Sequence, residues 1–99
     1  ARFVFTEINP VIASLSVFEP YPNPFNPSVD INFELDQDLH LKILVYNIRG
    51  EFVEELYDGI QIAGKHKLTW RSIHLPSGMY FIKFTSRQNV FVRQVFYIK

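Results

Sequence analysis

Side chains that could bind a metal gather in one short stretch, FELDQDLH at residues 33–40, where Glu34, Asp36, Asp38 and His40 fall close together. Calcium takes several oxygen ligands that converge from a loop. The spacing does not match a helix–loop–helix calcium site, and the stretch has no internal glycine. We therefore predict a solvated hairpin turn here rather than a metal site.

The other two histidines do not form a metal site either. His66 and His74 fall on different predicted elements, and the chain has no cysteine. Without a cysteine or a helical i, i+4 histidine pair, a zinc site is not expected. His66 alternates in phase with Leu68 and Trp70, which predicts a packed or edge histidine.

The sequence shows no recognisable catalytic group. Ser, His and Asp all occur, but there is no Gly-x-Ser-x-Gly nucleophile turn and no carboxylate pair in an acid/base context. We expect no enzyme activity and no cofactor. The formal net charge is +0, which argues against nucleic-acid binding, and no apolar run approaches the ~18 residues of a membrane-spanning helix.

Short segments with strand patterning recur along the chain. Apolar residues alternate with polar ones in each segment, and turn residues such as Gly50 and Pro76-Ser77-Gly78 separate them. We predict an all-β, immunoglobulin-like or fibronectin type III-like antiparallel β-sandwich of about seven strands, with a closed barrel as the nearest competitor. The predicted strands cover residues 15–19, 29–35, 39–46, 51–57, 66–70, 79–86 and 90–98.

The two ends of the chain differ in this patterning. Residues 1–14 fit the repeat less well, so we expect a linker or the tail of a preceding domain there and the sandwich in 15–99. Within the sandwich, LPSGMY at 75–80 has the form of a tyrosine corner, in which the Tyr80 hydroxyl bonds back to the upstream backbone. The alternative is an ordinary core tyrosine.

PYPNPFNPS at residues 20–28 places four prolines in a short run. Because proline lacks an N–H and disfavours helix at the preceding residue, we predict a rigid, extended edge segment that cannot pair with another chain's strand. Tyr21 and Phe25 are expected to cap the open end of the sandwich. A second interpretation makes this surface part of a recognition site, with its members at Tyr21, Pro22, Asn23 and Pro24.

Aromatic residues suggest a further surface. Tyr57, Phe81, Phe91 and Tyr97 either form an exposed strip that binds sugar rings or a protein, or fill the second side of strands that a loop covers. The first alternative keeps a carbohydrate-binding module open.

The final strand, residues 90–99, carries the strongest functional expectation. A terminal strand that ends in a basic residue is accessible to a receptor, either in place or through strand addition. Arg93 and Lys99 are its charges, and Gly78 and Tyr80 frame the neighbouring loop. Lys99 as a merely solvated terminus is the alternative.

Five segments in order resemble one family. YPNPFNPS, VYNIRGEFVEEL, AGKHKLTW, LPSGMYFIKF and RQVFYIK are similar to the C-terminal sorting domain (type A) of bacterial type IX secretion substrates. That family is close in sequence to the immunoglobulin-like domain of flagellar hook-capping proteins. The resemblance covers about residues 15–99.

The resemblance implies an immunoglobulin-like sandwich that delivers a larger exported protein. The cargo domain would lie upstream in the same chain and cross the inner membrane first. The outer-membrane secretion machinery would then recognise the folded domain, and a surface protease would remove it. The expected location is the periplasm in transit and then the cell surface or medium.

Two departures from the family pattern bear on this role. Gln94 stands where the family usually has Lys, with Arg93 beside it, and Asn47 stands where the family has Asp. Since fold alone does not fix function, other roles stay open. These are a passive or carbohydrate-binding module of a secreted hydrolase and an assembly scaffold like the hook-capping domains.

Overall fold

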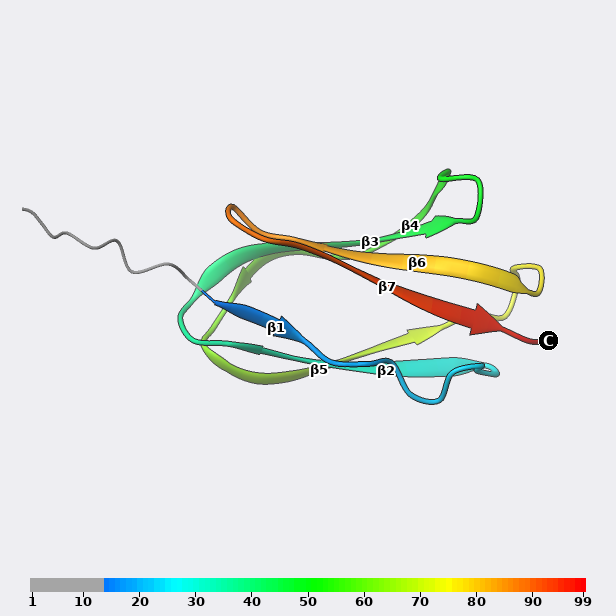
Figure 1. Cartoon of the computed structure of the whole chain (residues 1–99), viewed down its shortest axis with the longest axis horizontal. Coiled ribbons are helices and arrows are strands. Elements are labelled where there is room, and N and C mark those ends of the chain that lie inside the picture. Colours follow the sequence, from blue (N-terminus) through cyan, green and yellow to red (C-terminus); the bar gives the residue numbers. More distant parts are fainter. Residues whose placement is uncertain (1–13) are drawn as a thin grey trace, which may run out of the picture.

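A computed structural model describes residues 14–99, and in this part of the chain it has seven strands in two antiparallel sheets that face each other (Figure 1). The expectation for residues 1–13 lies outside the described residues. The strands are β1 (Leu15–Val17), β2 (Ser28–Leu35), β3 (Leu39–Asn47), β4 (Phe52–Gln61), β5 (Gly64–Arg71), β6 (Gly78–Thr85) and β7 (Val90–Tyr97).

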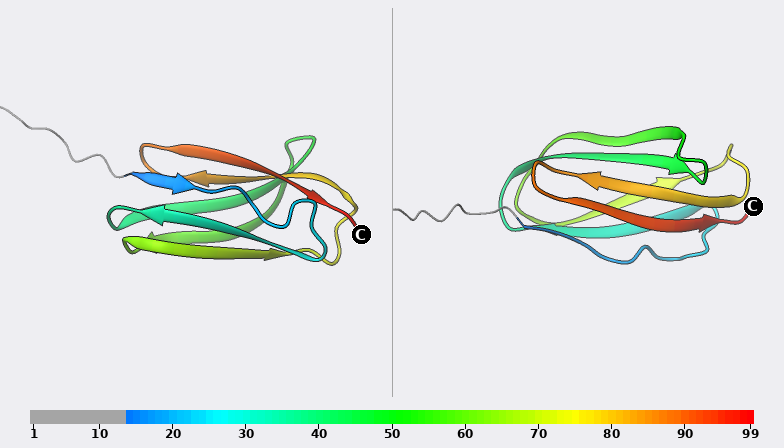
Figure 2. Two further views of the ribbon diagram at one scale, coloured as in Figure 1. Left: turned by 60° about the horizontal axis from the view of Figure 1, so that its bottom comes forward. Right: turned by 45° about the horizontal axis from the view of Figure 1, so that its top comes forward.

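The sheets have the strand orders β1-β2-β5 and β4-β3-β6-β7 (Figure 2). Both sheets keep open edges, so the sandwich prediction is confirmed and the closed barrel is wrong. The constant-type immunoglobulin arrangement has four strands in the first sheet and three in the second. Here β4 pairs with β3 instead, which makes the second sheet the larger one.

The core forms because alternate residues of each strand face the opposite sheet. In β2 the side chains of Val29, Ile31 and Phe33 are at most 2% exposed. Trp70 of β5 lies edge-on to the Tyr80 ring of β6, with ring centroids 5.6 Å apart. Aromatic and branched side chains from both sheets therefore fill one continuous core.

β4 is longer than the sequence predicts. The predicted strand ends at residue 57, before Asp58 and Gly59. β4 continues to Gln61 because Leu41 and Lys42 of β3 pair with those two residues. The Tyr57 hydroxyl lies over Gly59 and donates to the Ile60 carbonyl at 2.6 Å. Cross-strand pairing thus overrides the low strand propensity of the Asp-Gly pair.

The loop between β5 and β6 contains the predicted tyrosine corner. The Tyr80 hydroxyl donates to the Pro76 carbonyl at 2.7 Å, and the ring is buried. Burial raises the pKa of the Tyr80 phenol, and the neighbouring Tyr97 adds to that shift. This loop connects β5 of the three-stranded sheet with β6 of the four-stranded sheet. The hydrogen bond therefore fixes the end of the loop at the start of β6.

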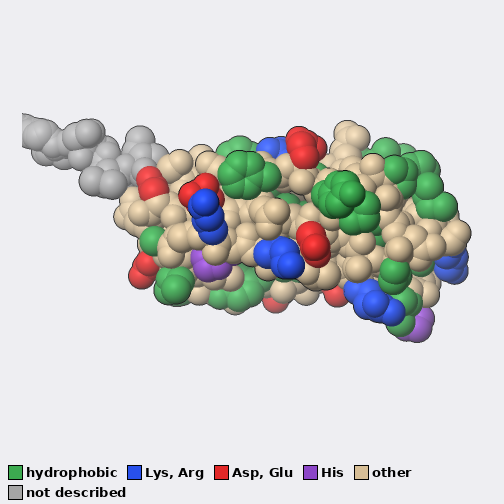
Figure 3. Space-filling view, turned by 90° about the horizontal axis from the view of Figure 1, so that it is seen from below, with side chains coloured by type: hydrophobic (Ala, Val, Ile, Leu, Met, Phe, Trp, Pro, Cys, Tyr) green, Lys and Arg blue, Asp and Glu red, His purple; other side chains and the backbone are tan. Residues whose placement is uncertain are grey.

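The outer face of the three-stranded sheet is polar. Lys65 lies opposite Glu34, and the Thr69 hydroxyl donates to the Asp30 carboxylate at 2.6 Å. Charged side chains of both signs are spread over this face, with some exposed apolar side chains among them (Figure 3). The outward side chains of β2 and β5 are therefore polar or charged throughout.

The exposed aromatic strip, one of the two alternatives for these residues, does not form as a unit. Tyr97 is only 3% exposed and faces the core, so for this residue the exposed alternative is wrong. The reason is the strand alternation, which puts Tyr97 on the same side of β7 as Val95. Phe91 and Tyr57 are half-buried against the core, and only Phe81 lies on the outer face, opposite Tyr46.

Candidate functional site: the terminal strand and its surroundings

β7 lies at the edge of the four-stranded sheet, and β6 is the one strand of residues 14–99 that pairs with it. Val95 and Tyr97 are buried in the core. The alternate residues point outward, and four of them keep large exposed apolar side chains: Val90, Val92, Phe96 and Ile98. The strand therefore presents two features to a partner, an apolar outer face and a backbone edge.

A short segment covers half of that edge. We call residues 23–25 the clasp. The Asn23 side-chain amide donates to the Gln94 carbonyl at 2.9 Å, and its oxygen accepts from the Phe96 N–H at 2.9 Å. The Phe25 N–H donates to the Phe96 carbonyl, and the Ile98 N–H donates to the Phe25 carbonyl. The Asn23 amide thus acts as a peptide group of an additional strand.

Phe25 anchors the clasp in the core. Its side chain is 1% exposed, and its ring centroid lies 5.2 Å from that of Tyr97 and 5.5 Å from that of Trp70. Phe25 therefore closes the end of the sandwich, as predicted. Tyr21 does not, because its side chain is 78% exposed and only its backbone pairs, with Asp30 of β2.

The proline-rich run is a bent loop, so its predicted extended form is wrong. Tyr21 bonds to the three-stranded sheet and Phe25 bonds to the four-stranded sheet, and the chain must bend to reach both (Figure 2). Proline has no backbone N–H, so the proline positions of this loop need no hydrogen-bond acceptor.

Arg93 lies between the two sheets. It shares the inward side of β7 with Val95, and its side chain is 25% exposed. One guanidinium nitrogen donates to the Val17 carbonyl of β1 at 2.6 Å, while Nε is buried 3.8 Å from the Glu19 carboxylate. A charged side chain therefore ties the free edge of β1 to β7.

The end of β7 meets the tyrosine-corner loop. The Lys99 N–H donates to the Ser77 hydroxyl at 2.8 Å, and Gly78 pairs with Tyr97. A hollow of about 240 Å³ opens beside this loop. It is lined by residues 47–49, 53 and 75–80.

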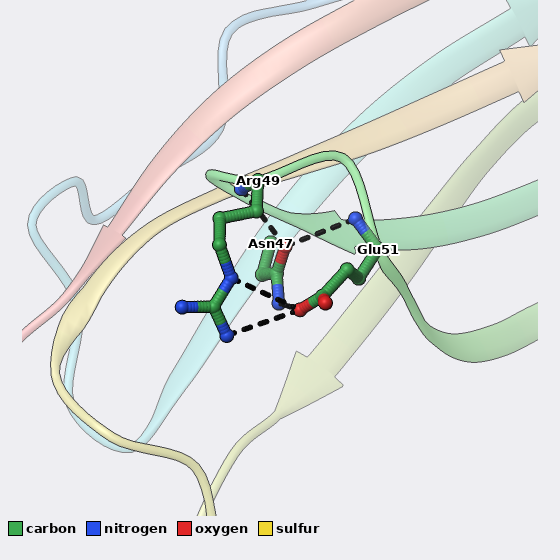
Figure 4. A network of polar contacts seen from close by, with 3 residues as sticks. All are labelled: Asn47, Arg49 and Glu51. Carbon is green, nitrogen blue, oxygen red and sulfur yellow. Dashed lines mark hydrogen bonds and ion pairs between the residues drawn. The ribbon is translucent and has the colours of Figure 1, made fainter.

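The β3–β4 hairpin forms the other wall of this hollow. Figure 4 shows the Asn47 oxygen accepting the backbone N–H groups of Arg49 and Glu51, while its amide donates to the Glu51 carboxylate at 2.7 Å. Arg49 also binds that carboxylate. Hydrogen bonds from Asn47 and Arg49, with the Arg49 charge, lower the pKa of the Glu51 carboxyl. The hairpin is thus held in one shape at the surface.

The residues predicted to serve recognition lie mostly around β7. Arg93 belongs to the strand, Gly78 and Tyr80 pair with it, Asn23 covers its edge and Lys99 follows it. Tyr21, Pro22 and Pro24 are exposed on the neighbouring loop. The sequence reasoning missed the outward residues Val92 and Phe96, although the period-two pattern of the last strand could have revealed them.

Two carboxylates of the acidic stretch accept hydrogen bonds from backbone N–H groups. The Asp36 carboxylate accepts from the Ser14 N–H, the Asp38 carboxylate accepts from the Ala63 N–H, and His40 pairs with Asp58 at 2.9 Å. No cluster of three metal-binding side chains occurs among residues 14–99. The same residues contain no helix that is long and apolar enough to cross a membrane.

His66 packs as the strand pattern predicts. Its ring stacks on Phe33 with centroids 5.2 Å apart, and its Nε2 lies 2.7 Å from the Ile62 carbonyl oxygen.

Comparison with known proteins identifies the family of this chain. Residues 19–99 match the family described as "Secretion system C-terminal sorting domain", which covers the loop, the clasp and every strand from β2 to β7. The chain therefore belongs to this family of sorting signals for type IX secretion, which directs proteins across the bacterial outer membrane. None of the curated proteins matches the sequence.

A solved structure shares the fold. It is the dimeric latent PorU from Porphyromonas gingivalis, with a TM-score of 0.65 and 15% sequence identity. The match covers 96% of this chain and 10% of that one, so the chain spans about a tenth of the length of that protein. At this identity the likeness establishes the sandwich fold alone.

Proposed function

We propose that the outer-membrane secretion machinery recognises this domain in its folded form, after the cargo has reached the periplasm. A surface protease then removes it. The observation that carries this proposal is the family match over residues 19–99, which spans the sandwich from its clasp to its terminal strand. The cargo would be joined upstream, with residues 1–14 as the linker and 15–99 as the sorting domain.

The contacts of β7 support recognition of a folded surface rather than of a linear tail. Asn23, Val17 and Ser77 all bond to residues of the last ten positions, and each comes from a distant part of the chain. An unfolded tail would keep none of these contacts. These contacts support a signal that is formed by β7 as the folded sandwich presents it.

The residues that we propose for recognition surround this strand: Tyr21, Pro22, Asn23, Pro24, Gly78, Tyr80, Arg93 and Lys99. Exposure divides them into two roles. Tyr80 is buried and Arg93 is mostly covered, so these two act by holding β7 in place. Tyr21 and Lys99 are exposed and are available for direct contact.

Gln94 bears on the same proposal. Its side chain points outward on β7, whereas Arg93 points into the gap between the sheets. Arg93 therefore cannot present its charge where the family usually has Lys. If an outward charge at this position is read, Gln94→Lys will increase delivery.

Sorting domains of this family are non-catalytic, and we expect no activity or cofactor in this chain. The other roles stay predictions: a carbohydrate-binding module would bind polysaccharide alone, and a scaffold related to the hook-capping domains would self-associate or bind a filament. No contact seen in residues 14–99 favours either role over sorting.

A transplant tests the proposed function. Residues 1–99 are fused behind an export signal and a fluorescent reporter, and surface fluorescence is measured in a bacterium with a type IX apparatus. The matched control is the same fusion in a host that lacks the apparatus. Delivery that depends on the apparatus supports sorting. Folded fusion protein retained in the periplasm of both hosts would refute it.

A further inference from the structure

The β6–β7 hairpin differs in charge from the rest of the chain. Residues 78–99 contain four cationic side chains, Lys83, Arg87, Arg93 and Lys99, and no aspartate or glutamate. All ten acidic residues of a chain with net charge +0 precede the hairpin. The hairpin is therefore a basic segment attached to an acidic remainder.

The outward side of this hairpin combines exposed Val92 and Phe96 with half-buried Met79 and Phe81, and it also carries Gln94 and the cation Lys83. We call it the outer hairpin face and define it as Met79, Phe81, Lys83, Val92, Gln94 and Phe96. Three cross-strand pairs form it, namely Met79 with Phe96, Phe81 with Gln94 and Lys83 with Val92. It continues onto β3 through Tyr46, whose ring lies 5.9 Å from the Lys83 Nζ.

The two sheets of the sandwich thus present different outer faces. On the three-stranded sheet, opposite charges and polar groups lie across from one another, as in the pair of Glu34 and Lys65. On the outer hairpin face, Lys83 lies between Leu44 and Val92 and has no acidic cross-strand neighbour. An apolar face of this kind is a common mark of a protein-binding surface.

The clasp determines how a partner can approach. Four backbone groups on the free edge of β7, at Gln94, Phe96 and Ile98, are already bonded to Asn23 and Phe25. A strand added along this half would have to break those bonds and withdraw a buried phenylalanine ring. Contact through side chains of the outer face requires neither change.

We infer that the secretion machinery recognises this domain by binding the outer hairpin face. The partner is a protein surface with apolar side chains and a carboxylate that meets Lys83. The Lys83 charge and the clasped half of the β7 edge both favour such a side-chain interface over strand addition along residues 94–98. The inference rests on the proposed sorting function and adds the location and chemistry of its binding surface.

Paired substitutions in the surface-delivery assay test this inference. Lys83→Glu reverses the charge on the outer hairpin face, and Lys67→Glu makes the same change on the outer face of the three-stranded sheet. Phe96→Ala removes an exposed apolar ring from the face, and Phe18→Ala removes one next to β1. Thermal unfolding of each purified variant checks that it is folded.

We expect Lys83→Glu and Phe96→Ala to lower delivery on the order of tenfold, as central interface residues do. The two controls should stay within roughly twofold of the original, as surface substitutions usually do. If Lys83→Glu is unfolded, Lys83→Gln replaces it, with a smaller loss expected.

Several outcomes would overturn the inference. Folded variants of the outer hairpin face that are delivered like the original chain refute the surface and leave the sorting function intact. Equal losses of surface delivery in Lys67→Glu and Phe18→Ala refute the location of the binding surface. An original chain that is not delivered refutes the sorting function, and the inference falls with it.

Discussion

Removal of the Asn23 amide should open the edge of β7 locally without unfolding the domain. In Asn23→Ala both side-chain bonds to β7 are lost, the one to the Gln94 carbonyl and the one from the Phe96 N–H. Each neutral hydrogen bond contributes roughly 0.5–1.5 kcal/mol net. Because Asn23 is exposed and water replaces part of the loss, we expect a total cost of about 1–2 kcal/mol.

Amide hydrogen exchange measures this opening residue by residue. The Phe96 N–H should exchange roughly 5–30 times faster in Asn23→Ala, which is the factor that corresponds to about 1–2 kcal/mol. The Val95 N–H provides an internal control. The N–H groups of successive residues in a strand point to opposite sides, so the Val95 amide points to β6 and not to the clasp.

A conservative variant separates the two bonds. Asn23→Asp keeps an oxygen that accepts from the Phe96 N–H but loses the donor to the Gln94 carbonyl, so it should protect Phe96 better than Asn23→Ala does. Unchanged exchange at Phe96 in Asn23→Ala would refute the clasp. Equal acceleration at Val95 and Phe96 would show that the variant loosens the whole strand.

Three further results are expected. Phe25→Ala should lower the free energy of unfolding by about 3–5 kcal/mol in chemical denaturation, as for a fully buried ring. Tyr21→Ala in the same loop should change this free energy by less than about 0.5 kcal/mol. Equal effects of the two substitutions would contradict the assigned burial of Phe25 and exposure of Tyr21. Tyr80→Phe should cost about 1 kcal/mol through its lost hydrogen bond. Since the folded-state pKa of the Tyr80 phenol is raised above 10.0, its contribution is complete below that pH and is lost as the pH rises through the folded-state pKa, so the original chain should lose more stability in alkali than the variant. By NMR titration the Glu51 pKa should lie below 4.5 and should rise in Asn47→Ala. The stability linked to this shift is present above pH 4.5 and is lost as the pH falls through the folded-state pKa, and an unchanged pKa in the variant would contradict the Asn47 bond as its main cause.

The sequence by itself determined the class of fold and the strands, because alternation and turn residues act locally. Val29, Ile31 and Phe33 had to share one side of a strand whatever they packed against. The tyrosine corner was readable for the same reason, since Pro76 and Tyr80 are close in the chain. The strand ends were less predictable: β1 ends at Val17, whereas β4 extends past residue 57 and β5 begins at Gly64, because both extensions depend on pairing with a neighbouring strand.

The tertiary structure alone decided what surrounds the terminal strand. The contacts of Asn23 with Gln94, of Arg93 with Val17 and of Lys99 with Ser77 join positions far apart in the chain. Local propensity carries no information about such pairs. Tyr21 and Phe25 are both aromatic residues of one proline-rich loop, yet only the bend between the two sheets decides that one is buried and the other exposed.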